Sequence, residues 1–130
     1  MLSTALFRII REEQKVEYRD GTLIREDGTD LMFVVMDGRL SLIENNDIFD
    51  ASKATTVDPT RLGHLGKERG PAIGSDAYLA IVEGKGYLVN NGEKRYFTSD
   101  AAIRKYNVNR SKFSERSAAD LPPTAGADLR

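Results

Sequence analysis

The chain has 130 residues, of which 40% are hydrophobic and 30% are charged, and it contains no cysteine. This composition is typical of one folded domain, argues against wholesale disorder, and leaves no thiolate for disulfide bonds or metal ligation. The sequence has no run of about 20 apolar residues, the length a helix needs to cross a bilayer. Its start, MLSTALFRIIREEQK, also lacks the features of a secretory signal. We therefore expect a protein that is cytoplasmic when it is synthesised.

The formal net charge is only −1, but the charges are unevenly distributed. Residues 1–60 carry 7 basic and 12 acidic side chains, whereas residues 61–130 carry 12 basic and 8 acidic ones. Two solvated faces of one domain would give this pattern. The same asymmetry would also let copies of the chain attract one another head to tail, or present a basic face to an acidic partner.

The first half of the chain predicts mostly short strands. Apolar residues at helical spacing between residues 2 and 10 favour a short amphipathic N-terminal helix, although a strand over residues 5–10 would also fit. Short candidate strands follow at residues 16–18 and 22–25. Residues 31–36 form the most apolar run, which is short enough for a strand buried on both faces.

Asp37-Gly38 comes directly after this run and predicts a β-hairpin, because a type I′ turn needs positive φ at both central residues. The return strand covers residues 39–43. Asn45-Asn46 then cap a predicted short helix over residues 47–53, whose Ile48 and Phe49 face inward.

The middle of the chain, residues 55–73, is rich in Gly, Pro, Thr and charge and predicts a linker or a long surface loop. It contains the only histidine, His64, which has no neighbouring imidazole or carboxylate that would indicate a catalytic or metal-binding role.

The second half repeats the pattern of the first. Residues 77–82 predict a buried strand, residues 87–97 a hairpin that turns at Asn91-Gly92, and residues 101–106 a short helix that starts after Ser99. Small polar residues and prolines after Ser114 predict an extended tail, anchored by Leu121.

Superposing Gly38 on Gly92, which lie 54 positions apart (92 − 38), aligns the two halves in the order strand, turn glycine, strand, cap and helix. Two unrelated hairpins that happen to look alike would be the alternative. We predict a β-rich α+β fold: one domain over residues 1–130, with two tandem hairpin-plus-helix units at about 16–60 and 70–126 and a short N-terminal helix. The final Gly126-Ala-Asp-Leu129 resembles the start of a third copy.

Part of the second unit also resembles a known repeat. The residues that carry the resemblance are Tyr87-Leu88-Val89, Gly92, Lys94-Arg95, Phe97, Ser99, the helix to Tyr106, Ser117, Asp120-Leu121 and Gly126. They are similar to a short repeat, Y-L-V-x-x-G-x-K-R-x-F-x-S, of bacterial surface proteins and phage-associated proteins. The resemblance implies a non-catalytic role and no active-site residues.

Three other patterns suggest different functions. Residues 100–116 resemble a helix-turn-helix whose basic side chains would lie near DNA phosphates, although few residues are left for a recognition helix. Residues 17–43 resemble the first strands of a cyclic-nucleotide-binding β-roll, but the phosphate-binding segment of that family is missing. Residues 26–30 place oxygen ligands around a glycine but lack the closing glutamate of a calcium loop.

The sequence shows no catalytic, cofactor-binding or metal-binding set. We expect a non-enzymatic structural or interaction module with protein partners or self-assembly into an oligomer, such as a phage virion protein (tail, neck or capsid-associated) or a surface-associated adaptor. The alternative is a small DNA-binding protein that uses residues 100–116. The residues expected to contact a partner are the basic ones of the second unit: Lys94, Arg95, Arg104, Lys105, Arg110 and Lys112.

Overall fold

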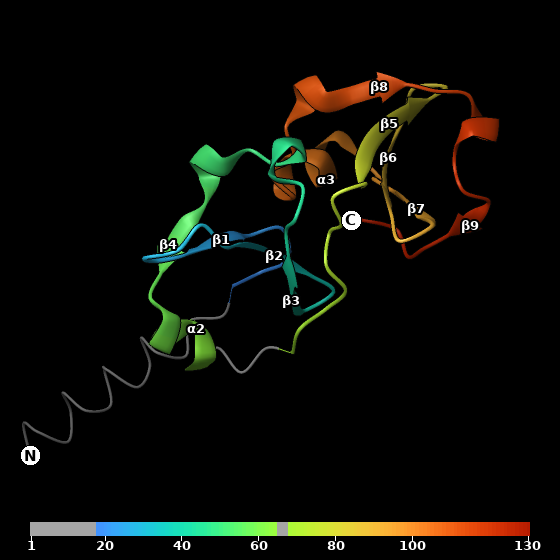
Figure 1. Ribbon diagram of the computed structural model, residues 1–130. Coiled ribbons are helices and arrows are strands. Elements are labelled where there is room, and N and C mark those ends of the chain that lie inside the picture. The colour runs from blue at the N-terminus through green and yellow to red at the C-terminus, as the bar shows by residue number, and fades with distance from the viewer. Residues whose placement is uncertain (1–17, 65–67) are drawn as a thin grey trace, which may run out of the picture.

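The computed structural model describes residues 18–64 and 68–130 of the chain. The predicted helix over residues 2–10 and most of the candidate strand at 16–18 lie outside them. Within the described residues, the strands form a four-stranded sheet in the order β3-β2-β1-β4 and a five-stranded sheet in the order β8-β5-β6-β7-β9. Figure 1 shows one sheet in each half of the chain, with α3 near the middle. This is the predicted β-rich α+β fold of two tandem units packed together.

The first unit is an antiparallel meander closed by a parallel strand. Its elements are β1 (Leu23–Glu26), β2 (Met32–Met36), β3 (Arg39–Leu42), two 3₁₀ turns (Asn46–Ile48 and Ala51–Lys53), β4 (Thr55–Val57) and α2 (Pro59–His64). β4 pairs in parallel with β1. The predicted helix over residues 47–53 is divided into two 3₁₀ turns, because the Asp50 side chain accepts hydrogen bonds from both the backbone N–H and the hydroxyl of Ser52 and so starts a new turn.

The second unit has the same order of pairing. Its elements are β5 (Tyr78–Val82), β6 (Lys85–Asn90), β7 (Glu93–Tyr96), α3 (Asp100–Lys105), a 3₁₀ turn (Arg110–Lys112), β8 (Phe113–Glu115), a 3₁₀ turn (Ala118–Asp120) and β9 (Thr124–Ala125). β8 pairs in parallel with β5, as β4 does with β1. The Ser99 side chain accepts a hydrogen bond from the backbone N–H of Ala102 and caps α3 at the predicted place.

The two hairpins match residue by residue. Phe33 lies opposite Leu42 in the first unit and Tyr87 lies opposite Tyr96 in the second, which is the offset of 54 that the sequence suggested. Both turns have the positive φ angles of a type I′ turn: 55° and 72° at Asp37-Gly38, and 53° and 73° at Asn91-Gly92. The two units therefore share one hairpin register as well as one order of strand pairing.

Segments predicted as linker and tail instead complete the two sheets. Residues 69–73 pair in parallel with β3 through Leu40–Arg69 and Ile43–Ile73, and residues 124–129 pair with β7 in the same way, ending at Phe97–Leu129. The predicted linker over 55–73 therefore contains β4, α2 and this pairing. Likewise, the presumed third copy at 126–129 is the last strand segment of the second unit.

Gly70 and Gly126 occupy equivalent places in these closing segments. A Cβ atom at Gly70 would lie 2.8 Å from the Ser41 Oγ, and one at Gly126 would lie 2.7 Å from a carboxylate oxygen of Glu93. A side chain at either position would have to displace side chains of the neighbouring strand, so the closing segment lies close against that strand.

The two units join through a short antiparallel bridge and one shared core. Phe49 and Val108 lie opposite each other; the backbone N–H of Asp50 donates to the Asn107 carbonyl and that of Asn109 to the Ile48 carbonyl, both at 2.8 Å. The central core contains buried residues of both units, among them Leu23, Val34, Phe49, Leu79, Phe97 and Leu129. Each unit thus buries its inner sheet face against the other, and the whole behaves as one packed body.

The outer face of each sheet has a smaller cluster of its own. In the first unit Leu62 of α2 packs on Ile24 and Phe33, and in the second unit Leu121 packs on Ala80 and Val89. Leu121 is therefore the anchor that the sequence predicted for the end of the chain. No helix in the described part of the chain is long and apolar enough to cross a membrane.

Candidate binding groove between the two units

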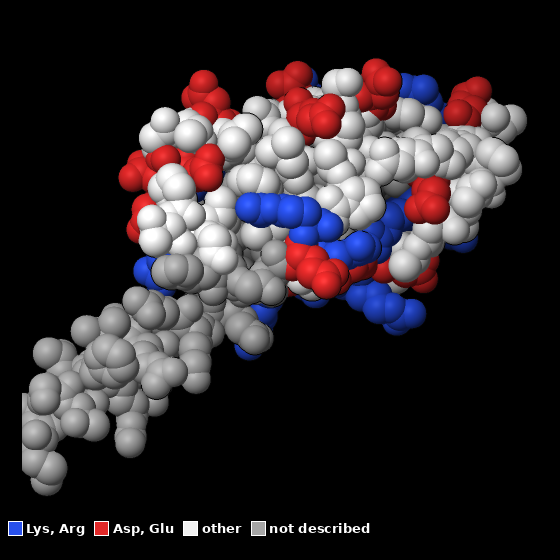
Figure 2. All heavy atoms as spheres, turned by 60° about the horizontal axis from the view of Figure 1, so that its bottom comes forward, with Lys and Arg blue, Asp and Glu red and all other residues white. Residues whose placement is uncertain are grey.

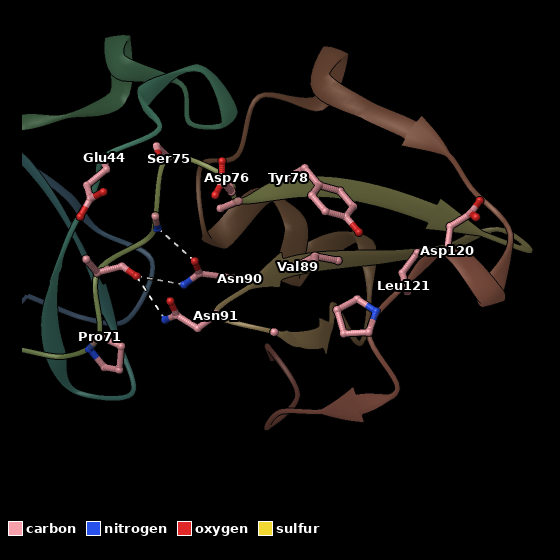
Figure 3. Close-up of a pocket in the computed structure, with 15 residues that line it drawn as sticks. Glu44, Pro71, Ser75, Asp76, Tyr78, Val89, Asn90, Asn91, Asp120 and Leu121 are labelled. Carbon is pink, nitrogen blue, oxygen red and sulfur yellow. Dashed lines mark hydrogen bonds between the residues drawn. The ribbon is translucent and has the colours of Figure 1, made fainter.

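An open groove of about 840 Å³ lies where the chain passes from the first unit to the second (Figure 3). One wall is residues 71–78, which lead into β5. The other consists of the end of β6, the Asn91-Gly92 turn and residues 120–122. Glu44, just after β3, is the lining residue from the first unit, and the other lining residues come from three segments of residues 71–122.

The side chain of Asn90 holds the first wall in place. Its Oδ1 accepts a hydrogen bond from the Gly74 backbone N–H at 3.0 Å, and its Nδ2 donates to the Ala72 carbonyl at 3.0 Å (Figure 3). Asn45 donates from its Nδ2 to the Ala77 carbonyl at 2.8 Å. These amides give the connecting chain hydrogen-bond partners that a loop otherwise finds in water, and so they fix the shape of the groove.

The groove is acidic. Glu44, Asp76 and Asp120 line it, and no Lys or Arg is among the residues that form its described surface. Asp120 is held in place because its carboxylate accepts hydrogen bonds from the Ser117 hydroxyl and backbone N–H. Glu44 and Asp76 are exposed, and therefore free to contact a ligand.

Apolar side chains lie beside the carboxylates, mainly Tyr78, Val89 and Leu121. The Arg116 guanidinium stacks on the Tyr78 ring, 4.7 Å from its centroid, and thereby orients that ring. A groove that is open to solvent, partly apolar and acidic suits an extended or protruding polypeptide segment with basic side chains better than a small molecule that must be enclosed.

Arg95, one of the predicted contact residues, is used inside the molecule. Its guanidinium makes two hydrogen bonds to the Asp37 carboxylate, at 2.9 and 3.0 Å, and its Nε donates to the Ala127 carbonyl at 2.7 Å. Only 14% of its side chain is exposed. Figure 2 shows Lys and Arg side chains gathered in the middle of one face, with acidic side chains directly beside them. The Arg95–Asp37 ion pair links the turn of the first unit to β7 of the second.

Three more of the predicted residues also have intramolecular partners. Arg104 and Arg110 both pair with Asp100, and Lys105 donates from its Nζ to the Arg130 carbonyl at 3.0 Å. Lys94 and Lys112 make no ion pair within the described residues. Nevertheless, Arg104 and Arg110 keep 70% and 52% of their side chains exposed, so they are still open to a partner.

The helix-turn-helix interpretation of residues 100–116 is wrong. α3 ends at Lys105, Asn107 has a φ of 54°, and the chain continues as a 3₁₀ turn and the strand β8. No second helix forms because Val108 pairs with Phe49 of the first unit and Phe113 pairs with Leu79 in the sheet. The segment therefore offers no recognition helix for a DNA groove.

The ionisable groups with shifted pKa values lie outside the groove. Hydrogen bonds from Ser52 lower the pKa of Asp50, and the hydrogen bond from Arg110 lowers the pKa of Asp100. Burial at the junction of the two units raises the pKa of the Tyr106 hydroxyl. In each case the pKa shift comes from a hydrogen bond or from burial within the folded chain. Among the described residues, no group of three or more potential ligands could hold a metal ion.

Sequence reasoning identified none of the three groove carboxylates. They come from the end of β3, the connection before β5 and the 3₁₀ turn after β8, and no local pattern relates them. The fold and groove together define a class: a β-rich α+β protein of two tandem units with an acidic groove between them. Comparison with known protein families, with curated proteins and with solved structures finds no match to this chain.

Proposed function

We propose that the protein is a non-enzymatic interaction module, which holds a protein partner as a component of a larger assembly such as a phage virion or a bacterial surface structure. The observation that supports this proposal most directly is the open acidic groove formed jointly by the two units. A basic segment of a protein partner would find the exposed carboxylates of Glu44 and Asp76 and, on the side of Asp76 away from Glu44, the ring of Tyr78 (Figure 3).

The remaining interactions are consistent with a scaffold. Arg95–Asp37, the Phe49–Val108 bridge and the common core join the two units into one body, which would keep the groove in a fixed shape. A preformed surface of this kind loses little conformational entropy when a partner binds.

An NMR titration of the isotope-labelled chain tests the proposal. The probe is an extended peptide rich in Lys and Arg, and the control is a peptide of equal length rich in Glu. We expect the basic peptide to shift the amide signals of Gly74, Ser75 and Asn91 and the acidic one to leave them unchanged. Shifts at some other surface, or none at all, would contradict the assignment of the groove.

A double variant sharpens the test. Glu44→Gln with Asp76→Asn removes two exposed charges, each worth about 0.2–1 kcal/mol in an ion pair, and should weaken peptide binding by about tenfold. The matched control is Asp30→Asn with Asp128→Asn, which removes two exposed carboxylates outside the groove. Titration with duplex DNA examines the alternative function: tight binding with a steep salt dependence would favour a DNA-binding protein.

A further inference from the structure

We propose that the groove takes the basic surface of a second copy of this chain, so that the protein associates head to tail. This inference rests on the proposed function, because it names the partner that the groove holds. It arises from two surfaces of opposite charge that the fold presents at different places on the same molecule.

The second surface, called here the basic surface, surrounds α3. Lys53, Arg104 and Arg110 line a hollow of about 530 Å³ together with Ile103 and Val108. Lys112, which is exposed and belongs to the same 3₁₀ turn as Arg110, completes the basic surface beside this hollow. A smaller hollow of about 170 Å³ continues from it past Ile103 to Phe113. Basic side chains therefore stand around an apolar floor on this side of the second unit.

The charges of the two surfaces are complementary. Three acidic residues lie beside the four basic ones: Asp50, whose carboxylate accepts hydrogen bonds from Ser52; Asp100, which pairs with Arg104 and Arg110; and the exposed Asp47, whose 3₁₀ turn packs against that of Arg110–Lys112. The surface thus keeps an excess of positive charge, whereas the groove has three carboxylates and no basic residue in its lining. Complementary potentials of this kind favour encounter and fix orientation.

The apolar parts also correspond. The accessible apolar surface of the groove is mainly the half-buried Tyr78 ring, because Val89 and Leu121 are buried in the outer cluster of the second sheet. In the basic surface it is mainly the half-buried Ile103, because Val108 is buried in the central core. An interface of moderate affinity typically has this form, with an apolar centre and a charged rim.

The groove and the basic surface share no residue, so a contact between them joins unlike surfaces of two copies. Such a heterologous contact leaves one groove and one basic surface unused in every pair. A third copy can therefore add at either end, and the assembly grows beyond a dimer into a closed ring or an open chain, according to the rotation between copies.

Light scattering and sedimentation of the full chain test the inference. The average mass should rise above the 14.4 kDa of one chain as concentration approaches about 1 mM at low salt. It should fall back to one chain when the ionic strength is raised from about 0.01 M to about 1 M, which shortens the screening length from about 30 Å to about 3 Å. A single-chain mass at every concentration would overturn the inference.

Two charge-reversal variants identify the surfaces. Glu44→Lys with Asp76→Lys reverses the charge of two groove residues, and Lys53→Glu with Lys112→Glu reverses the charge of two residues of the basic surface. All four side chains are exposed. Each variant alone should stay a single chain. An equimolar mixture should associate again, because the first variant keeps its basic surface and the second keeps its groove. Variants that still associate alone, or a mixture that stays monomeric, would contradict head-to-tail contact.

Asp30→Lys with Asp128→Lys supplies the matched control, since it makes the same change in net charge outside both surfaces and should still associate. Circular dichroism verifies that each variant is folded, and the neutral pair Glu44→Gln with Asp76→Asn replaces the groove reversal if it is not. The peptide titration is independent of this result: a groove that binds the basic peptide in a chain that never associates would retain the proposed function and reject the second copy as its partner.

Discussion

Gly21→Ala is expected to destabilise the protein strongly. Gly21 has a φ of +95°, a conformation that costs an alanine about 1–2 kcal/mol. A Cβ atom there would also overlap the carbonyl group of Lys105, with the carbonyl carbon only 2.7 Å away. Forcing an atom into a packed site typically costs a further 1–3 kcal/mol or so. The sum, about 2–5 kcal/mol, is a large part of the stability of a typical domain.

Gly28→Ala separates the two contributions. Gly28 also has a positive φ, +78°, but a Cβ atom there would meet nothing within 4 Å. The entropy that alanine removes from the unfolded chain is the same in both variants and cancels in the comparison. The extra loss at Gly21, about 1–3 kcal/mol, therefore measures the close approach of the first unit to the end of α3.

Urea unfolding followed by far-UV circular dichroism gives both values from the transition midpoints, provided that the slope with urea is unchanged. If Gly21→Ala destabilises the protein no more than Gly28→Ala does, the two units do not meet at Lys105 as described. The reasoning about their shared core would then be wrong as well.

Three further predictions concern contacts described above. Arg95→Met should lower the free energy of unfolding by about 1 kcal/mol, because the Arg95–Asp37 ion pair is bidentate and half-buried. A double-mutant cycle with Asp37→Asn should show coupling between the two residues. Additive effects would show that the two side chains do not interact. Leu121→Ala should cost about 2 kcal/mol or more in thermal unfolding, since this side chain covers the outer cluster of the second sheet. Arg110→Met should lower the melting temperature at neutral pH. Because Arg110 lowers the pKa of Asp100, its stabilisation is present above the unfolded pKa of about 3.9 and is lost as the pH falls through the folded value, so the two melting temperatures should converge in acid.

The hairpins could be predicted from sequence because their signals are local. Asp37-Gly38 and Asn91-Gly92 satisfy the backbone requirement of a type I′ turn, and the apolar runs before them are long enough to identify buried strands. Ser99 likewise marks the start of α3 with a single side chain. The α+β class and the two-unit organisation follow from these short-range patterns alone.

The parallel closing segments and the groove could not be predicted in the same way. β4 has three residues and β9 has two, and such short strands are defined by a partner elsewhere in the chain more than by their own composition. Residues 69–73 look like a loop until β3 lies beside them. Val108 fits a helix-turn-helix pattern in the sequence, but in the structure it forms an antiparallel β-bridge with Phe49, a residue of the other unit.

That bridge has a consequence for the history of the chain. The two backbone hydrogen bonds around Phe49 and Val108 are reciprocal, so exchanging the two units leaves the hydrogen bonding of this bridge unchanged. Two identical subunits related by a two-fold axis meet in the same self-complementary way. A single ancestral unit would already have had the surface needed to pair with a second identical unit. Tandem duplication of its gene would then have joined such a pair in one chain while keeping the existing contact.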